Sequence, residues 1–176
     1  MKSKYVLRVS SGTLRGRGIA SPEGMSVRPT ATRVKEALFN RYRMRMNGAD
    51  FLDLFAGTGQ MGLEALSNGA NAVFADQNTA LARKNIEAVG ARATVLQADF
   101  RETVHRLQAR GLSFDFIFAD PPYRDGLYGE IIALCLPLLK ADGVLILEHA
   151  TEVPIPEAEE TRTFGSRSLS FIGGSL

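Results

Sequence analysis

From residue 51 onward, short apolar runs alternate with longer stretches in which apolar residues recur at helical spacing. The apolar runs predict buried strands at 51–55, 72–75, 93–96, 114–119 and 144–148. The longer stretches predict helices at 61–68, 79–89, 100–110 and 126–139, the last interrupted near Pro137. Five such β-α units predict an α/β fold with a doubly wound, Rossmann-like sheet that is mostly parallel and has helices on both faces.

Both ends of the chain depart from this alternation. Residues 162–164 and 168–172 flank Gly165-Ser166 and predict a closing pair of strands, so the C-terminal edge of the sheet is expected to be antiparallel. Before residue 51 the pattern predicts a hairpin of strands 5–10 and 14–20, and then a helix over 31–46 with Thr30 as its N-cap. We therefore expect a hairpin and helix extension, residues 1–47, on a main α/β domain, residues 48–176.

The net charge of +2 conceals a strong asymmetry along the chain. Residues 1–47 contain 11 Lys and Arg against 2 Glu, which makes this segment +9, whereas residues 48–176 carry −7. A basic segment of this kind favours a polyanionic partner, although solvated surface charge would give the same composition. The cations expected to contact a nucleic acid lie on the hairpin and on the following helix: Arg8, Arg15, Arg17, Arg33 and Lys35.

Composition also restricts other kinds of chemistry. The single cysteine, Cys135, excludes an internal disulfide and is expected to be a buried apolar residue rather than a nucleophile. His105 and His149 have no ligand-type neighbours at metal-binding spacing, so no metal site is expected. No apolar run has the length of a signal peptide or of a membrane span, and nothing demands a dimer, so we expect a cytoplasmic monomer with no membrane partner.

The most informative stretch is Phe51-Leu-Asp-Leu-Phe-Ala-Gly-Thr-Gly-Gln-Met-Gly62, a predicted strand followed by a glycine-rich turn and a helix. Gly57 and Gly59 allow a tight turn and let a ligand approach the backbone N–H groups. This glycine spacing alone fits any dinucleotide-type pocket. Asp53 is more specific, because a carboxylate inside a buried strand needs a partner, and the ammonium group of a ligand beyond the strand end would supply one.

Acidic residues also follow the next two strands, at the edge of a parallel sheet where ligands bind. Asp76 can accept both hydrogen bonds of a ribose diol, and Asp99 can accept one from an adenine amino group. With Asp53 they describe a nucleoside that carries a cationic amino-acid tail, which is S-adenosylmethionine. A helix cap or an exposed loop charge remains the alternative for each acid taken singly. The expected cofactor site also includes neighbouring residues, namely Phe55, Gln77 and Phe100.

The predicted strand over 114–119 ends in Asp120-Pro121-Pro122-Tyr123, a rigid turn because both prolines fix φ. The Asp120 carboxylate and the Pro121 carbonyl can accept the two N–H bonds of an exocyclic amine, which directs the nitrogen lone pair. Tyr123 can stack on the base. We therefore expect these four residues to form the catalytic motif of a methyltransferase that acts mainly by positioning and electrostatics.

Two motifs, Asp53-Leu-Phe-Ala-Gly-Thr-Gly59 and Asp120-Pro-Pro-Tyr123, resemble those of class I S-adenosylmethionine-dependent methyltransferases that act on exocyclic amines. Three further segments resemble the RsmD family more specifically: Gly12-x-x-Arg-Gly-Arg17, Arg28-Pro-Thr-x-x-Arg-Val-Lys-Glu-Ala-Leu-Phe-Asn40 and Leu63-Glu-Ala-Leu66. This resemblance implies methylation of guanine N2 in bacterial small-subunit (16S) rRNA, with Arg28, Thr30 and Arg33 near the cofactor and the RNA. The chain departs from the family pattern at three places, with Ser10-Ser11 for glycines, Asp76 for Glu and Tyr123 for Phe.

Four functions therefore compete. The leading hypothesis is an rRNA guanine-N2 methyltransferase whose substrate is naked RNA or a partly or fully assembled ribosomal subunit. An adenine-N6 methyltransferase on DNA or RNA would use the same cofactor, and Tyr123 is usual there, but the chain has no room for a target-recognition insertion. A non-catalytic ribosome-assembly protein is disfavoured by the intact motif at Asp120. An NAD(P) oxidoreductase would leave Asp53 without a purpose.

Overall fold

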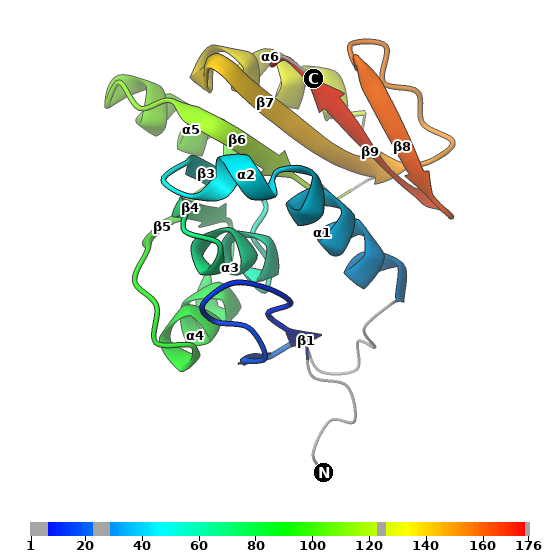
Figure 1. Cartoon of the computed structure of the whole chain (residues 1–176). Helices are drawn as coiled ribbons and strands as arrows, with labels where there is room; N and C mark the ends of the chain where they lie inside the picture. The colour runs from blue at the N-terminus through cyan, green and yellow to red at the C-terminus, as the bar shows by residue number, and fades with distance from the viewer. Residues whose placement is uncertain (1–6, 23–28, 123–125, 175–176) are drawn as a thin grey trace.

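The computed structural model describes residues 7–22, 29–122 and 126–174, which are arranged around a central sheet (Figure 1). In this part of the chain the sheet has seven strands in the order β5-β4-β3-β6-β7-β9-β8. Their bounds are β3 (Asp50–Asp53), β4 (Asn71–Asp76), β5 (Thr94–Gln97), β6 (Phe114–Ala119), β7 (Leu139–Ala150), β8 (Glu160–Phe164) and β9 (Arg167–Ile172). Strands β3 to β7 are parallel, and β9 pairs antiparallel with both β7 and β8. The predicted doubly wound, mostly parallel sheet is confirmed.

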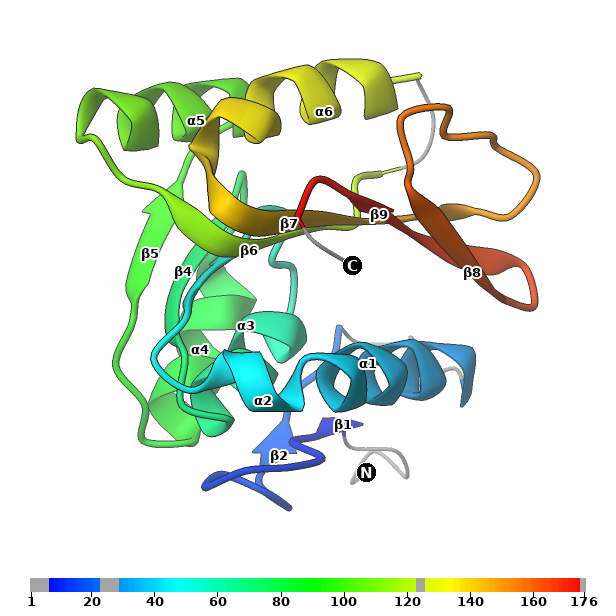
Figure 2. The same cartoon turned by 45° about the horizontal axis from the view of Figure 1, so that its top comes forward.

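Helices cover both faces of this sheet (Figure 2). One face carries α5 (Phe100–Ala109) and α6 (Tyr128–Cys135), the latter followed by a short 3₁₀ helix (Leu136–Leu138). The other face carries α1 (Pro29–Arg41), α2 (Arg43–Met46), α3 (Gln60–Ser67) and α4 (Ala80–Ala88). Side chains alternate between these layers along each strand, so Phe51 of β3 belongs to the α1–α3 core and Leu52 to the α5–α6 core. Both faces are buried, which explains the nearly continuous apolar runs.

The order of the strands locates the ligand-binding edge. The chain moves outward from β3 to β4 and β5, and then crosses back to place β6 and β7 on the other side of β3. The direction of winding therefore reverses between β3 and β6. In open α/β sheets, a crevice forms at this point beyond the carboxyl ends of the strands. The residues that follow β3 and β6 are the two motifs singled out in the sequence.

The N-terminal segment differs from its prediction in detail. The hairpin is confirmed, but its paired strands are only β1 (Leu7–Arg8) and β2 (Gly18–Ile19), while residues 5 and 6 lie outside the described part. Helix α1 begins at Pro29, so Thr30 lies inside its first turn, and the prediction that Thr30 is the N-cap is wrong. A proline at the first helical position is already set for helical φ and lacks only an N–H that would have no intrahelical partner. The helix also breaks at Tyr42, which separates α1 from α2.

Polar side chains of α3 and α4 hold this hairpin against the main domain. The buried Glu64 carboxylate accepts hydrogen bonds from the backbone N–H groups of Ser10 and Ser11, at 3.0 and 2.9 Å. The Asn85 side chain accepts from the Ala20 N–H at 2.8 Å and donates to the Ala20 carbonyl at 2.9 Å. Apolar hairpin residues join the same core as β3, namely Leu7, Val9 and Ile19. The hairpin is therefore packed and bonded to the main domain along its length.

Cys135 is fully buried in the α5–α6 core, as the sequence predicts. Burial raises the pKa of its thiol to about 12, so it is an unreactive packing residue. None of the helices in the described residues is long and apolar enough to cross a bilayer.

Candidate active site

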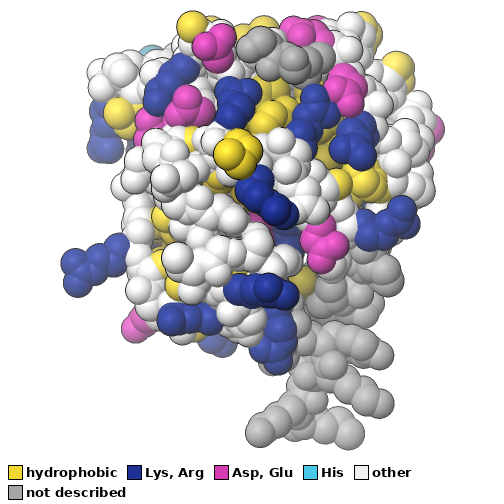
Figure 3. Space-filling model, viewed as in Figure 1, with side chains coloured by type: hydrophobic (Ala, Val, Ile, Leu, Met, Phe, Trp, Pro, Cys, Tyr) yellow, Lys and Arg dark blue, Asp and Glu magenta, His cyan; other side chains and the backbone are white. Residues whose placement is uncertain are grey.

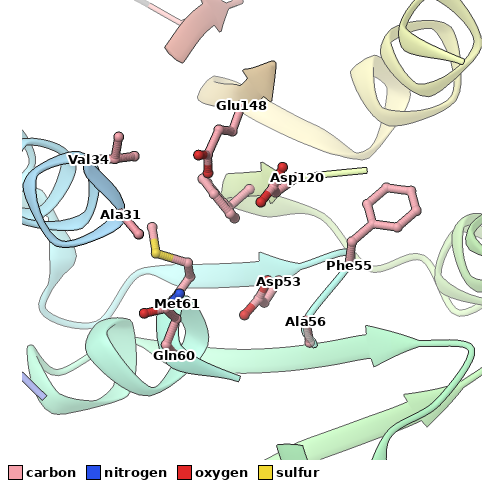
Figure 4. Close-up of a pocket in the computed structure, with 10 residues that line it drawn as sticks. Ala31, Val34, Asp53, Phe55, Ala56, Gln60, Met61, Asp120 and Glu148 are labelled. Atoms are coloured by element: carbon pink, nitrogen blue, oxygen red, sulfur yellow. The ribbon is translucent and has the colours of Figure 1, made fainter. Parts of the chain in front are cut away.

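A cavity of about 100 Å³ lies at the carboxyl edge of the sheet, where β3, β6 and β7 end beside α1 and α3 (Figure 4). Three acidic residues come from these three neighbouring strands and lie around the same space: Asp53, Asp120 and Glu148. The remaining lining residues are apolar or neutral: Ala31, Val34, Phe55, Ala56, Gln60, Met61 and Phe118. The site therefore gathers three acidic side chains in one small hollow.

Asp53 is the most buried of these acids, with 1% of its surface exposed. Its carboxylate accepts a hydrogen bond from the Gly62 N–H at 2.9 Å, and no Lys or Arg among the described residues forms an ion pair with it. Burial, reinforced by the negative charges of Asp76 and Asp120, raises the pKa of Asp53 to about 7. A buried carboxyl group in this state would be stabilised as the anion by a cationic ligand, which is the arrangement the sequence predicts.

The glycines of the turn have distinct physical roles. Gly57 and Gly59 have φ of 54° and 82°, and a Cβ added to Gly57 would meet nothing within 4 Å, so this backbone is open to a ligand. Gly62 is required for packing instead, because a Cβ there would lie 2.3 Å from the Phe74 ring. The close approach of α3 to β4 in turn places the Gly62 N–H on Asp53.

Asp76 ends β4 next to the glycine turn. Its carboxylate accepts hydrogen bonds from the Gly57 N–H at 2.9 Å and from the Asn78 N–H at 3.1 Å. Gln77 is exposed beside it, and the Asn78 side chain accepts from the Ala80 N–H just before α4, whose N-cap is Thr79. Asp76 thus both fixes the turn and remains half-exposed at the edge of the site.

Asp99 occupies the N-cap of α5, where its side chain accepts hydrogen bonds from the N–H groups of Arg101 and Glu102. It also forms an ion pair with the Arg101 guanidinium at 3.5 Å. Asp99 is therefore a helix cap, which was the alternative that the sequence left open for it. A ligand that bound its half-exposed carboxylate would share that group with the N-terminus of α5. Phe100 is buried and packs on Phe55, with ring centroids 5.5 Å apart, so Phe55 is the one of this pair that lines the cavity.

Asp120 follows β6 and faces two residues from the C-terminal strands. Arg167 of β9 donates from Nη2 to Asp120 Oδ1 at 2.8 Å and from Nε to Glu148 Oε1 at 3.4 Å. Pro121 is buried and Pro122 is exposed, whereas Tyr123 lies outside the described residues. Burial raises the pKa of Asp120, and the Arg167 charge opposes that rise. Burial, reinforced by the Asp120 charge, raises the pKa of Glu148 to about 7.

Sequence reasoning missed Glu148 and Arg167. Glu148 carries the same signal as the predicted acids, because it lies at the carboxyl end of a predicted strand beside Asp120. Arg167 gives no local signal, since it reaches the site only because β9 inserts between β7 and β8. Ala31, Val34 and Met61 were missed for a similar reason, because their small or apolar side chains are typical of core residues.

The predicted RNA-contacting residues divide into two groups. Arg8, Arg15, Arg17 and Arg33 are exposed, and Lys and Arg side chains gather on the face that carries the hairpin, α1 and α2 (Figure 3). Arg8 and Arg17 also bond backbone carbonyls, those of Gly16 and Val89.

Lys35 is different, and the prediction that it contacts RNA is corrected. Lys35 is 2% exposed, donates to the Arg8 carbonyl at 2.8 Å and lies 3.5 Å from the Glu64 carboxylate. Its charge is used inside the protein to balance Glu64. Arg28 lies outside the described residues, and half-buried Thr30 is adjacent to Ala31, which lines the cavity.

The residues present fit S-adenosylmethionine. The buried acid Asp53, which has no ion-pair partner among the described residues, faces the cavity. The backbone at Gly57 is free of side-chain obstruction, and Asp76 offers carboxylate oxygens at the cavity edge. The described residues contain no cluster of three or more His, Cys, Asp or Glu side chains arranged to hold a metal ion.

The strand order, the glycine turn and the acidic cavity together define a class I methyltransferase. A structure described as a putative methyltransferase, yhhF, from Escherichia coli superposes with a TM-score of 0.80 and 27% identity, covering 97% of this chain and 99% of that one. The chain belongs to the family described as Conserved hypothetical protein 95, whose model matches residues 7–171. The resemblance to the RsmD family is thereby confirmed.

Named relatives support the same family. The putative rRNA methyltransferase YlbH of Bacillus subtilis is 35% identical over 159 residues, which cover 86% of each protein. Ribosomal RNA small subunit methyltransferase D of Haemophilus influenzae is 30% identical, covering 99% of this chain and 94% of that protein.

Proposed function

We propose that the protein uses S-adenosylmethionine to methylate the exocyclic N2 amine of a guanine in small-subunit rRNA. The observation that carries the proposal is the placement of Asp53 and Asp120 around one cavity, at the point where the winding of the sheet reverses. The first acid suits a cationic cofactor and the second an amine substrate. The names of the family relatives supply the substrate class, since one is named a putative rRNA methyltransferase and the other a ribosomal RNA small subunit methyltransferase.

Several residues would hold the cofactor. Asp53 would pair with its amino group, Asp76 with its ribose hydroxyls, and the Gly57–Gly59 turn would lie against it without intervening side chains. Bound in this way, S-adenosylmethionine supplies a methyl group that its sulfonium already activates. The protein therefore has to position two reactants and exclude water rather than create a nucleophile of its own.

Asp120 and Pro121 would position the target amine. The lone pair of an exocyclic amine is delocalised into the ring, and acceptors on both N–H bonds favour a pyramidal nitrogen with a directed lone pair. The carboxylate of Asp120 and the carbonyl of Pro121 are adjacent in the chain and can provide both acceptors. Tyr123 would stack on the base, as aromatic side chains do on unpaired bases.

Residues 1–47 would form the RNA-binding extension. Arg15 and Arg33 are exposed on the hairpin and on α1, the helix that also contributes Ala31 to the cavity wall. Phosphates bound along this basic face would therefore pass close to the site of chemistry. We infer that the substrate is a ribosomal particle, because the 176 residues of this chain can contact little RNA alone. We further propose that the protein acts in the cytoplasm as a monomer.

The test is transfer of labelled methyl groups to unmodified small subunits, naked rRNA and duplex DNA, followed by digestion to nucleosides. Label in N2-methylguanosine supports the proposal, whereas label in N6-methyladenine would move the target to adenine. Asp120→Ala should lower turnover by roughly 10²- to 10³-fold, as removal of one preorganised polar group does. Asp142→Ala, which changes an exposed acid on β7, is the matched control. Absence of label with any substrate, while the cofactor still binds, would reject the proposed function.

A further inference from the structure

Three side chains from three different strands form a bonded cluster at one wall of the cavity. Arg167 of β9 contacts Asp120 Oδ1 at 2.8 Å through Nη2, and Glu148 Oε1 at 3.4 Å through Nε. The Asp120 and Glu148 carboxyl groups lie at the ends of neighbouring strands and are bridged by the same guanidinium, and the Asp120 charge raises the pKa of Glu148, so the pair tends to hold one proton between them. The Glu148 side chain is only 13% exposed and that of Arg167 19%, whereas Asp120 is 41% exposed toward the cavity.

The surroundings of this cluster decide where the proton lies. Arg167 makes its shorter contact with Asp120, which favours the ionised form of Asp120 and leaves the shared proton on Glu148. Tyr128 of α6 also faces the cluster, and burial raises the pKa of its hydroxyl, so it stays neutral. His149, next to Glu148 on β7, is buried, which lowers the pKa of its ring and keeps it neutral as well. Asp53 lines the same cavity, and the Asp120 charge contributes to the raised pKa of the Asp53 carboxyl group.

We propose that Glu148 is the proton acceptor of this site, receiving through Asp120 the proton that the target amine loses on methylation, and that Arg167 positions the two carboxyl groups for this transfer. The inference rests on the proposed function and extends it to residues outside the Asp120–Tyr123 motif. Asp120 alone could accept a hydrogen bond from the amine. If the Glu148 carboxyl group then takes up the proton that the amine loses, Asp120 stays ionised and keeps its hydrogen bond to the substrate.

Methyl transfer to the amine displaces one proton, and the carboxyl groups of Asp120 and Glu148 account for it. As the nitrogen lone pair forms the new N–C bond and the C–S electron pair stays with sulfur, the nitrogen becomes positively charged and loses one proton. That proton passes to the Asp120 carboxylate, and Asp120 returns to its ionised form by protonating Glu148. Glu148 then releases the proton to solvent through its exposed fraction. Glu148 can take up this proton from Asp120 only when Glu148 is itself ionised, so turnover should rise with pH through about 7, the pKa of Glu148.

Glu148→Gln is the first test, because the amide keeps the size of the side chain and can still donate to Asp120 but cannot take up a proton. At saturating cofactor and RNA we expect kcat to fall roughly 10- to 100-fold and its rise through neutral pH to disappear. Glu152→Gln, which changes an exposed acid in the loop after β7, should behave as wild type. Wild-type kcat and pH dependence in Glu148→Gln would overturn the inference, while a label still found in N2-methylguanosine would leave the proposed function intact.

A second readout needs neither cofactor nor substrate. Carboxyl titration by ¹³C NMR of the Asp53→Asn protein should show one group titrating near pH 7, and that signal should be absent from the Asp53→Asn, Glu148→Gln double variant. If no Glu148-dependent titration occurs in this range, the inference fails even if methylation is observed.

The role of Arg167 is tested in the same way. Arg167→Gln removes the positive charge that favours the ionised form of Asp120. The pH profile of kcat should therefore shift to higher pH, with kcat roughly 10-fold lower at pH 7 and largely recovered above pH 8.5. Arg167→Lys keeps the charge and should shift the profile less. Arg162→Gln, on the adjacent strand β8, is the control. An equal loss at every pH would indicate a structural role and would reject positioning by Arg167.

Discussion

The buried carboxylate of Glu64 accepts a hydrogen bond from the backbone N–H of Ser10 at 3.0 Å, joining residues 54 positions apart. The same carboxylate bonds the Ser11 N–H and hydroxyl and lies 3.5 Å from the Lys35 ammonium group. It therefore accepts hydrogen bonds from the hairpin backbone and also balances the charge of the buried Lys35. This contact explains why the basic hairpin is held against α3 although, in the described residues, its strands pair over only two residues each.

Glu64→Ala should destabilise the protein by about 3 kcal/mol, because it leaves the Lys35 charge and two hairpin N–H groups without their partner. Urea denaturation measures this change in the free energy of unfolding. Glu87→Ala on the exposed side of α4 supplies the reference for loss of a glutamate. A loss below about 1 kcal/mol would show that the Glu64 network contributes little net stability.

Gly12 and Gly16 form a matched pair for testing how tightly the hairpin is packed. Both have positive φ, 79° and 85°, but a Cβ on Gly12 would lie 1.9 Å from the Ser67 carbonyl oxygen, whereas a Cβ on Gly16 would meet nothing within 4 Å. Gly16→Ala should lose about 1 kcal/mol from backbone strain alone. Gly12→Ala should lose distinctly more, and should weaken RNA binding because the hairpin must shift. Equal melting temperatures for the two variants would contradict the close contact with Ser67.

The sheet could be predicted well because its signals are local. Each buried strand is a short apolar run, each helix has its own period, and Gly165-Ser166 marks the closing hairpin. The acids at the strand ends could also be predicted, since the position of a residue at the carboxyl end of a parallel strand already fixes which edge it reaches. Asp53, Phe55 and Asp120 accordingly line one cavity.

What could not be predicted depends on contacts between distant segments. Lys35 has the sequence character of a surface cation, and only the approach of Glu64 and the Arg8 carbonyl makes it a buried one. Arg167 reaches Asp120 because β9, and not β8, pairs with β7. No periodicity in the sequence specifies that choice.

Asp53→Asn should increase the free energy of unfolding at neutral and higher pH, because it removes the cost of ionising a buried carboxyl group at the cofactor site. Burial raises the pKa of Asp53 from 3.8 to about 7 in the folded protein, so the folded state binds this proton more tightly than the unfolded state does. Stability is therefore greatest below the unfolded pKa and falls as pH rises toward 7. The asparagine variant lacks this loss, and it should unfold with a free energy higher by at most about 4 kcal/mol at pH 8 but close to wild type at pH 4.

Thermal melts of both proteins across this pH range provide the measurement. The same variant should bind S-adenosylhomocysteine at least 10-fold more weakly, because it lacks the negative charge for the ligand amino group. A stability difference that does not change with pH would mean that Asp53 is not held in its protonated form.

Asp76→Ala separates the cofactor site from the RNA surface. The Asp76 carboxylate holds the Gly57 N–H at 2.9 Å and would accept the ribose hydroxyls, so its loss should weaken S-adenosylhomocysteine binding by roughly 10- to 100-fold. RNA affinity should change by less than about 2-fold, because Asp76 lies at the edge of the sheet site and not on the basic face. Isothermal calorimetry of each ligand distinguishes the two effects. A larger change for RNA than for the cofactor product would overturn the assignment of Asp76 to the ribose.

Exposed arginines on the hairpin and α1 should govern how RNA binding depends on salt. Each phosphate contact that releases a counterion contributes about 0.7 to 0.9 to the magnitude of the slope of log K against log salt concentration. If Arg15 and Arg33 each contact one phosphate, Arg15→Ala and Arg33→Ala should each reduce the magnitude of the slope by about this amount. Arg110→Ala changes an exposed arginine just after α5, which covers the opposite face of the sheet, and should leave the slope unchanged. Filter binding at several salt concentrations gives these slopes directly. If all three variants keep the wild-type slope, Arg15 and Arg33 do not contact phosphates, and the assignment of these two residues to the RNA surface is wrong.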